Sequence, residues 1–264
     1  MTDLGYRPTA HALAQALADS QCFLVYQPVF DLRSERMNGA EALLRWRHPL
    51  WGTIPPDRFL PLAEDTGLIV PIGRWVLGTA CEQAAQWRTR HDLGISINLS
   101  TRQLNDGHLV ADLESALSRS ALEPGAVTLE ITEATLMADE AVSTAVLGEL
   151  RTLGVRVAID DFGTGRCSLA QLAAFPIDAI KIDRCFVSDP DGLLVVRMIV
   201  KLGKMLGLET LGEGIEDAAQ LRALQALECD SGQGFHLAEP LGPELIDALL
   251  DEHAARSGAG LAAA

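Results

Sequence analysis

The stretch "RVAIDDFGTG" at residues 156–165 places two neighbouring aspartates directly after an apolar run. The run is typical of a strand covered on both faces, because the strands of doubly covered parallel sheets are continuously apolar. Asp160 and Asp161 follow where this strand leaves the core. Two adjacent carboxylates repel each other unless a positive charge lies beside them. The stretch therefore predicts a buried strand that ends at a cation site.

Strand-like and helix-like segments alternate along almost the whole chain. The predicted strands span residues 23–32, 38–46, 94–100, 127–133, 155–162, 179–184, 208–216 and 229–235. Stretches with apolar residues three or four apart, which predict helices, span residues 75–88, 103–121, 141–153, 194–206 and 218–227. Eight strands that alternate with helices fit a (β/α)₈ barrel better than an open sheet. The first two strands are joined only by "RSERM", which is too short for a crossover helix and indicates an antiparallel hairpin. The fold class predicted is α/β, a modified TIM barrel with an antiparallel first strand.

Composition and charge exclude several classes of partner. The chain has 264 residues, a formal net charge of −15 and 48% hydrophobic residues. Such an acidic chain is a poor match for a nucleic-acid polymer, which requires a basic surface, and for an anionic membrane. The most hydrophobic stretch, "GLIVPIGRWVLGTAC", contains Arg74 and Pro71 and is too short to cross a bilayer. We therefore expect no membrane insertion by this chain.

Cysteine usage indicates a reducing compartment. The five cysteines are odd in number and show no CxxC spacing. The sequence also begins without the basic start and apolar run of a secretory signal. Reduced thiols in a cytoplasmic protein are therefore the better interpretation, and a zinc site is not expected.

Polar side chains recur near the carboxyl ends of the predicted strands. They are Glu41 and Arg45, Asn98, Glu130 and Glu133, Asp160 and Asp161, Lys181 and Asp183, Glu213 and Glu216, and Gln233. A barrel gathers these ends on one face, where so many carboxylates would strongly destabilise one another if left alone. Divalent cations resolve the repulsion, and oxygen ligands without His or Cys favour Mg²⁺ or Mn²⁺. Two such ions about 3.5–4 Å apart clamp a phosphate and activate water, so the aspartate pair is interpreted as half of a two-metal site.

Each residue taken singly has a structural alternative. Asn98 could cap the following helix, although Ser100 is better placed to do so. Asp161 could be a turn residue that introduces "FGTG". Lys181 could be a paired core lysine, and Glu213 and Gln233, which stand beside glycines, could be loop residues only. The functional interpretation depends on the recurrence of such residues from strand to strand.

Seven ordered motifs give the chain a family resemblance. They are "EALLRW" at residues 41–46, "NLS" at 98–100, "EITE" at 130–133, "DDFGTG" at 160–165, "KIDR" at 181–184, "EGIE" at 213–216 and "QGF" at 233–235. In these motifs and their order the chain resembles the EAL-domain family, whose members are phosphodiesterases that open cyclic di-GMP to linear pGpG. The resemblance implies a modified barrel with an antiparallel first strand, two Mg²⁺ or Mn²⁺ ions and a homodimer. It divides the chain into an N-terminal extension at residues 1–9, an EAL phosphodiesterase domain at residues 10–250 and a disordered C-terminal tail at residues 251–264.

The resemblance also implies a role for each matching residue. Glu41, Asn98, Glu130 and Asp160 would hold one metal ion, with Asp160 bridging to a second ion held by Asp161, and Glu213 completing the shell. Lys181 would position or deprotonate the attacking water, with its pKa lowered by the two cations. Gln233 and Glu216 would orient water and ligand, and Arg45 would bind a phosphate oxygen. Glu133 would hold the regulatory loop, which includes Gly163, Gly165 and Arg166.

The chain departs from the family pattern at several positions outside the metal ligands. Arg166 and Cys167 stand where the family usually has an aromatic residue and a serine, and Glu239 stands where a basic residue is frequent. The set of acidic ligands and Lys181 is complete, which favours an active cyclic di-GMP phosphodiesterase. A receptor that binds cyclic di-GMP without cutting it is the second hypothesis. A different metal-dependent barrel enzyme, such as one that stabilises an enolate with Mg²⁺, is the third.

Overall fold

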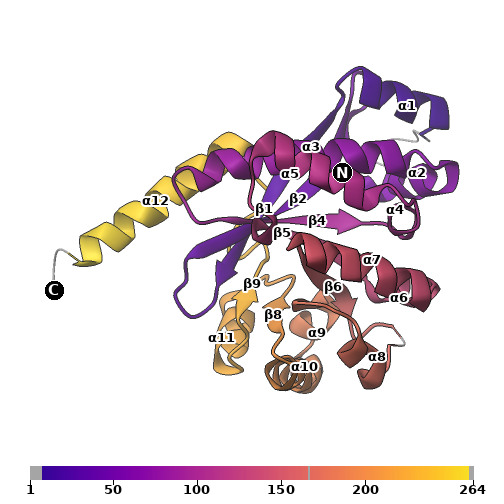
Figure 1. Ribbon diagram of the computed structural model, residues 1–264. Coiled ribbons are helices and arrows are strands. Elements are labelled where there is room, and N and C mark those ends of the chain that lie inside the picture. The colour runs from indigo at the N-terminus through magenta and orange to yellow at the C-terminus, as the bar shows by residue number, and fades with distance from the viewer. Residues whose placement is uncertain (1–7, 166, 262–264) are drawn as a thin grey trace.

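The computed structural model describes residues 8–165 and 167–261, with side chains as far as residue 252. In this part of the chain the strands form one nine-stranded sheet (Figure 1). The strands are β1 (Cys22–Asp31), β2 (Met37–His48), β3 (Gly52–Ile54), β4 (Gly94–Leu99), β5 (Val127–Thr132), β6 (Arg156–Phe162), β7 (Ala179–Ile182), β8 (Glu209–Gly212) and β9 (Ser231–Gly232).

The sheet closes on itself through its first strand. The strand order is β1-β9-β8-β7-β6-β5-β4-β2-β3, and β1 also pairs with β2. β1 runs antiparallel to both of these neighbours, β2 and β9, whereas the pairs from β2–β4 through β8–β9 are parallel. The predicted α/β modified barrel with an antiparallel first strand is therefore confirmed. β3, which pairs antiparallel with the far end of β2, lies outside the closed ring.

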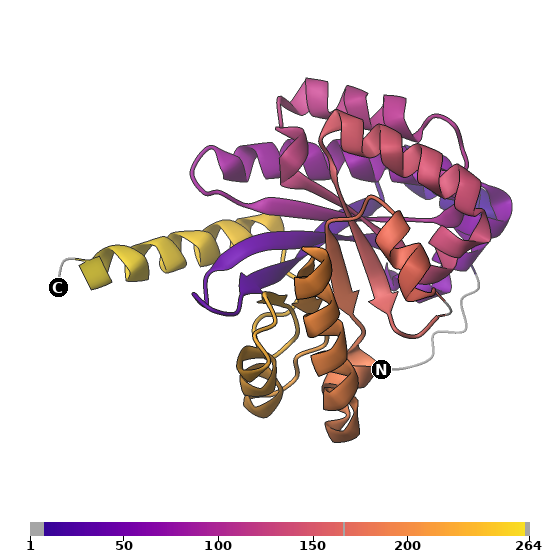
Figure 2. The same cartoon turned by 60° about the horizontal axis from the view of Figure 1, so that its bottom comes forward.

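Helices surround this barrel (Figure 2). They are α1 (Ala10–Ala18), α2 (Leu60–Thr66), α3 (Ile69–Arg88), α4 (Thr101–Leu104), α5 (Leu109–Ser120), α6 (Glu133–Ala138), α7 (Glu140–Leu153), α8 (Leu169–Ala174), α9 (Arg184–Ser188), α10 (Leu193–Leu206), α11 (Ala218–Ala226) and α12 (Pro243–Leu261). Over the described residues, none of these helices combines the length and the apolar character needed to span a membrane.

The apolar core lies between the sheet and the helices rather than inside the barrel. On β4, Ile95, Ile97 and Leu99 are at most 5% exposed, whereas the alternate residues Ser96 and Asn98 are more accessible. Successive side chains of a strand point to opposite faces, so one set faces the helices and the other faces the barrel axis. This alternation places polar side chains along the axis, where the candidate site is built.

Three details differ from the sequence-based expectations. The helix expected at residues 103–121 is divided into α4 and α5, because Gly107 adopts a left-handed conformation with φ +70 between them. The three-residue β3 was not expected. The helix α12 runs through Leu261, so much of the range 251–264, which we expected to be a disordered tail, is helical. The domain boundaries themselves stay a prediction.

Candidate metal centre

Lys181 lies at the centre of a group of carboxylates contributed by four other strands or strand ends. Its Nζ lies 2.6 Å from Glu130 Oε2, 2.8 Å from Glu213 Oε1, 3.1 Å from Asp160 Oδ1 and 3.4 Å from Glu41 Oε2. We call these four acidic residues together with Asp161 the acidic cluster. The Lys181 side chain is only 2% exposed, so its charge interacts with its partners with little screening by water. Sequence reasoning predicted that these residues meet, and the structure brings them together.

Two amide side chains orient the acidic cluster. Asn98 Nδ2 donates to Glu41 Oε1 at 2.6 Å, and Gln233 Nε2 donates to Glu41 Oε2 at 2.7 Å and to Glu213 Oε1 at 3.1 Å. Ser100, rather than Asn98, caps α4, where it forms a capping box with Gln103, as the sequence indicated. Asn98 is therefore free to act at the site. Gln233 Oε1 is a buried acceptor that has no hydrogen-bond partner within the part of the chain that the structure describes.

The two neighbouring aspartates reach the same site because the backbone turns between them. Adjacent residues of a regular strand point to opposite faces. Here the β6–β7 register shifts between Ile159 and Phe162, and Asp161 adopts φ +53. Carboxylate oxygens of Asp160, Asp161 and Glu213 consequently lie within 4.8 Å of one another. Aspartate tolerates this left-handed conformation better than most residues, which explains how "DD" can supply two ligands to one centre.

Burial and mutual repulsion shift the pKa values of the cluster. Burial raises the pKa of Glu213 to about 7, with the Lys181 charge opposing and the Asp160 and Glu41 charges adding to the rise. Burial, then the Asp160 charge and a hydrogen bond with Asp183, raise the pKa of Asp161 to about 6.

The pKa values of the two most buried carboxylates of the cluster shift in opposite directions. Burial, followed by the Glu41 charge, raises the pKa of Glu130 well above its ordinary value. Burial also acts to raise the pKa of Glu41, but the Lys181 charge and the hydrogen bonds from Gln233 and Asn98 outweigh it and hold that pKa below its ordinary value. Burial acts to lower the pKa of Lys181, yet the surrounding carboxylates, Glu130 first, raise it well above its ordinary value. With carboxylates alone around it, Lys181 is therefore an ammonium ion.

The acidic cluster fits divalent cations. Five carboxylates share one ammonium group, so the site carries excess negative charge, which the raised pKa values of Glu130, Asp161 and Glu213 express. Among the described residues the donors are carboxylate oxygens with the amide oxygen of Asn98 nearby, and neither His nor Cys takes part. Hard oxygen donors in this number suit Mg²⁺ or Mn²⁺ rather than zinc.

Glu133 holds the loop that follows the aspartate pair. Its Oε2 accepts hydrogen bonds from Gly163 N at 3.3 Å and Gly165 N at 3.2 Å, and its Oε1 accepts one from Cys167 N. A side chain at Gly165 would not fit, because its Cβ would lie 2.5 Å from Glu133 Cδ. Arg166, the remaining residue of the predicted regulatory loop, lies outside the described residues.

A cavity of about 360 Å³ opens above the acidic cluster. It is lined by Glu41, Asp161, Glu213, Glu216 and Gln233, and by Asp183, which was predicted only as a strand-end residue without a role. Residues that sequence reasoning gave no role also line it: Gln27, Leu43, Arg184, Gly214, Gly234 and Phe235. Glu216 is exposed at the rim, and Phe235 is 67% exposed. The signal for Gln27 was available in part, because it is a polar residue within the apolar first strand and its register partner is Glu41.

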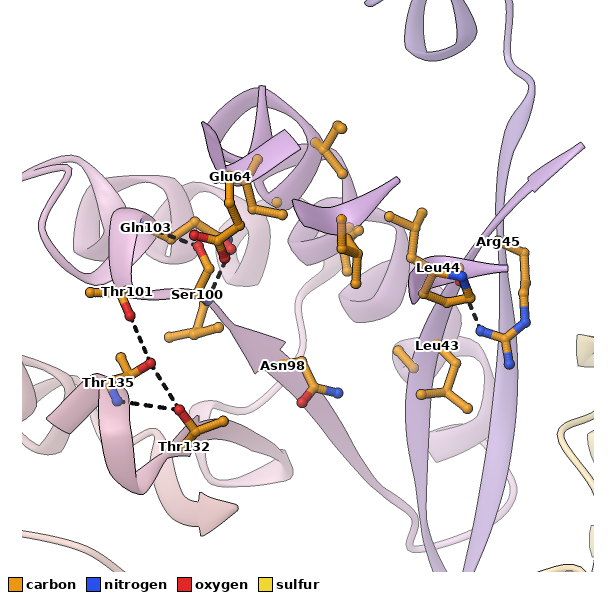
Figure 3. A pocket seen from close by; sticks show the side chains of 18 residues that line it. Leu43, Leu44, Arg45, Glu64, Asn98, Ser100, Thr101, Gln103, Thr132 and Thr135 are labelled. Carbon is orange, nitrogen blue, oxygen red and sulfur yellow. Dashed lines mark hydrogen bonds between the residues drawn. The ribbon is translucent and has the colours of Figure 1, made fainter. Parts of the chain in front are cut away.

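A second, mainly apolar cavity of about 430 Å³ adjoins the first at Leu43, which lines both. Figure 3 shows Arg45 at its edge, with the guanidinium donating to Leu44 O at 2.8 Å. Among the described residues, Arg45 lies near the acidic cluster and forms no ion pair with it. Burial lowers the pKa of Arg45, and the Glu41 charge partly opposes that shift. The guanidinium keeps further N–H groups free to bind an anion.

Comparison with known proteins identifies the family. The family model of the EAL domain matches residues 10–240. The chain belongs to the EAL-domain family. It is 45% identical over 242 residues to the bifunctional diguanylate cyclase/cyclic di-GMP phosphodiesterase MucR of Pseudomonas aeruginosa, covering 89% of this chain and 35% of that protein. It is 39% identical over 234 residues to the cyclic di-GMP phosphodiesterase PdeR of Escherichia coli, covering 87% of this chain and 35% of that protein.

Solved structures agree with this EAL-domain assignment. The PaMucR phosphodiesterase in complex with c-di-GMP superposes with a TM-score of 0.86 at 45% identity, covering 89% of this chain and 98% of that one. The FimX EAL domain of Pseudomonas aeruginosa bound to c-di-GMP superposes with a TM-score of 0.80 at 27% identity, covering 87% and 94%. The chain spans about a third of the length of the two curated relatives described above.

Proposed function

We propose that this EAL domain is a phosphodiesterase that hydrolyses cyclic di-GMP to linear pGpG. The observation that carries the proposal is the acidic cluster around Lys181 at the floor of an open cavity. Relatives named as cyclic di-GMP phosphodiesterases, and a structural neighbour that is a c-di-GMP complex, support the choice of substrate. A complete acidic cluster favours hydrolysis over binding alone.

Two Mg²⁺ or Mn²⁺ ions fit the donor set. When bound, such ions polarise a phosphodiester and make a bound water more acidic. We assign Glu41, Asn98, Glu130 and Asp160 to one ion and Asp161 to the other, with Asp160 bridging and Glu213 completing the shell. The short separation of the Asp160, Asp161 and Glu213 oxygens supports this assignment.

Lys181 and Gln233 are assigned to handling the attacking water. Lys181 carries a proton at Nζ while only carboxylates surround it, so in that state it orients water as a donor. Cations that neutralise the carboxylates would remove the cause of its raised pKa, and proton acceptance by Nζ becomes accessible in that state. Gln233 Oε1, the buried acceptor without a protein partner, is suited to orient a water O–H.

The two adjoining cavities fit the two halves of a cyclic dinucleotide. Arg45 stands beside their junction at Leu43, where a phosphate oxygen can accept from its free N–H groups. Glu216 at the rim and the exposed ring of Phe235 are available to a base on the side of the acidic cluster. We accordingly assign Arg45, Gln233 and Glu216 to substrate binding.

A cytoplasmic homodimer completes the proposal. Leu194, Met198 and Met205 are 65%, 63% and 83% exposed along α10, which gives that helix an apolar outer stripe suited to a second copy. The loop held by Glu133, with Gly163, Gly165 and Arg166, is assigned to regulation because it follows Asp161 directly. The five free thiols support a cytoplasmic location.

Chromatography of the products tests the function. The purified protein is incubated with cyclic di-GMP in Mg²⁺, in Mn²⁺ and in chelator. We expect linear pGpG only when metal is present. Intact nucleotide under every condition, together with tight nucleotide binding, would replace the enzyme with a receptor. Equal turnover in chelator would contradict the metal assignment.

A further inference from the structure

The interior of the barrel below the acidic cluster is built from small and polar side chains. A cavity of about 100 Å³ lies there, and its lining includes Ser96, Thr128, Ala158, Ala179 and Ser231. The interior of a (β/α)₈ barrel is normally filled by layers of bulky branched residues. The branched residues Val29 and Leu211 also line this cavity, but the small side chains beside them leave it unfilled below Glu130 and Lys181.

This cavity opens to solvent at the amino-terminal end of the strands. Asn38, Gly94, Arg156 and Glu209 line its lower part, and Asn38 and Glu209 are exposed. Arg156 Nη2 and Glu209 Oε2 form an ion pair of 2.7 Å there, with side chains 34% and 61% exposed. Water therefore reaches the lower opening, which lies on the side opposite the cavity above the acidic cluster.

The upper end of the cavity is closed by the candidate site itself. Glu130 and Lys181 line the cavity, and each side chain is 2% exposed. Thr128 is two residues before Glu130 on β5, and Ala179 is two residues before Lys181 on β7, so each lies one inward position lower on the same strand face. The Glu130–Lys181 ion pair therefore separates this lower cavity from the cavity above the acidic cluster, and both cavities face solvent.

Two hydroxyl groups in the cavity are available to water. Ser96 and Thr128 are partly exposed although they face the barrel axis, whereas their outward neighbours Ile95, Ile97 and Leu129 are at most 1% exposed. Among the described residues, no hydrogen bond to protein engages Ser96 Oγ or Thr128 Oγ1. A polar cavity holds water once it exceeds roughly 10–15 Å³ and offers two or more polar partners, and this cavity meets both conditions.

We propose that the lower half of the barrel is a water-binding shaft, in which Ser96 and Thr128 hold ordered waters that hydrate the Glu130–Lys181 pair from the amino-terminal side. The shaft gives the candidate site a second contact with solvent, separate from the cavity above the acidic cluster. Thr128 and Ser96 are positioning residues: they act on the reaction through bound water and the ion pair, and they do not touch the substrate. The kinetic part of this proposal rests on the proposed hydrolysis of cyclic di-GMP, whereas the hydration part does not.

Crystallography and water ¹⁷O relaxation dispersion of the full chain test the hydration directly. We expect ordered waters within hydrogen-bonding distance of Thr128 Oγ1 and Ser96 Oγ, and a contribution from long-lived internal water in the relaxation profile. Thr128→Val, which keeps the shape but removes the hydroxyl, should lose the water at that position. Ala179→Leu should fill the shaft and remove most of this contribution. A dry shaft in the wild-type protein overturns the proposal, whether or not the protein hydrolyses cyclic di-GMP.

Kinetics test the positioning role. Thr128→Val is expected to lower kcat for cyclic di-GMP about tenfold with KM changed less than about twofold, because a small displacement of catalytic groups reduces rate more than binding. Thr128→Ser, which restores a hydroxyl, should recover most of kcat. Thr144→Val and Ala145→Leu on the exposed surface of α7 make the matched changes outside the barrel and should leave kcat unaltered. If Thr128→Val loses the ordered water but keeps the wild-type kcat, the positioning role is overturned. If Ala179→Leu fails to fold, the isosteric Thr128→Val still decides the question.

Discussion

Lys181 Nζ and Glu130 Oε2 lie 2.6 Å apart, with 2% of each side chain exposed. A buried ion pair of this kind contributes little net stability, because desolvation of both charges offsets their attraction. Breaking it by removing one partner is costly, since the other charge remains buried alone. Glu41, Asp160 and Glu213 surround the same ammonium group, so the pair is part of a site with more negative than positive charge. The first predictions follow from that imbalance.

Replacing Lys181 with methionine should make the protein depend on metal for stability. In chelator we expect Lys181→Met to lower the free energy of unfolding by about 3 kcal/mol, because the carboxylates lose their cation. Mn²⁺ should raise the Tm of this variant more than that of the wild type, as measured by thermal unfolding. Arg222→Met on the exposed face of α11 is the control. Equal Mn²⁺-induced increases in both proteins would show that Lys181 does not offset the charge of the cluster.

Removing Glu41 should abolish most of the activity. Glu41 accepts hydrogen bonds from both amides of the site and lies 3.4 Å from Lys181 Nζ, so its loss disturbs every group that handles metal or water. We expect Glu41→Ala to reduce pGpG formation by at least about 100-fold. Glu114→Ala, an exposed position on α5, should have no effect. Activity retained by Glu41→Ala would refute its assignment as a ligand.

Stability in chelator should fall as the pH rises. Glu213 and Asp161 have pKa values raised to about 7 and about 6 from ordinary values of 4.5 and 3.8. A carboxyl whose pKa is higher in the folded than in the unfolded state stabilises the fold when protonated, and that contribution is lost as the pH rises through the folded-state pKa. We therefore expect Tm in chelator to decrease between about pH 4.5 and 7, with a smaller decrease in Glu213→Gln.

The same titrations predict how metal binding depends on pH. Protons compete with cations for these carboxylates, so Mn²⁺ affinity should increase from about pH 5.5 to 7.5. Calorimetric titration with Mn²⁺ at several pH values measures the trend. An affinity independent of pH across this window would show that neither Glu213 nor Asp161 is a ligand.

Weakening the contacts of Glu133 should impair the site through the loop. Glutamine at this position keeps one acceptor oxygen, but its NH₂ group faces backbone N–H donors that now lack a partner. We expect Glu133→Gln to lower kcat about tenfold and to raise the Mn²⁺ concentration needed for half-maximal rate, because Asp161 precedes this loop. Glu140→Gln, which alters an exposed hydrogen bond to Gln171, is the control. Unchanged metal dependence would separate the loop from the metal centre.

Arg45 should affect substrate binding more than metal binding. Its side chain lines the apolar cavity two residues after Leu43, which lines both cavities, and its guanidinium keeps N–H groups for a phosphate. We expect Arg45→Ala to raise KM for cyclic di-GMP about tenfold while Mn²⁺ affinity stays within about twofold. Arg47→Ala changes the same residue type two positions later on β2, where the side chain stacks on Phe23 at 4.5 Å, and should leave KM unaltered. A KM unchanged in Arg45→Ala would remove it from the binding site.

The pattern of residues predicted the barrel and the members of the acidic cluster because both depend on local information. Apolar strands with regular spacing predict parallel pairing, and parallel strands bring their carboxyl ends together. The break between α4 and α5 was missed although "NDGH" at residues 105–108 interrupts the apolar spacing and contains the turn dipeptide Asp-Gly. Gln27 was missed because a polar residue in an apolar strand is only a partial signal, and its pairing with Glu41 becomes visible only in the strand register.

The sequence by itself determined the alternation of strands and helices, the antiparallel start and the set of polar residues at the strand ends, since periodicity and strand order decide these features. Only the tertiary structure decided how they meet. The left-handed turn at Asp161 directs adjacent aspartates into one site, and burial raises the pKa values of Glu130 and Glu213. The hollow below Lys181 also required coordinates, because the space left by small residues depends on how far apart the closed sheet holds them. Periodicity encodes which side of a strand a residue faces, whereas distance, dielectric environment and empty volume are properties of the packed chain.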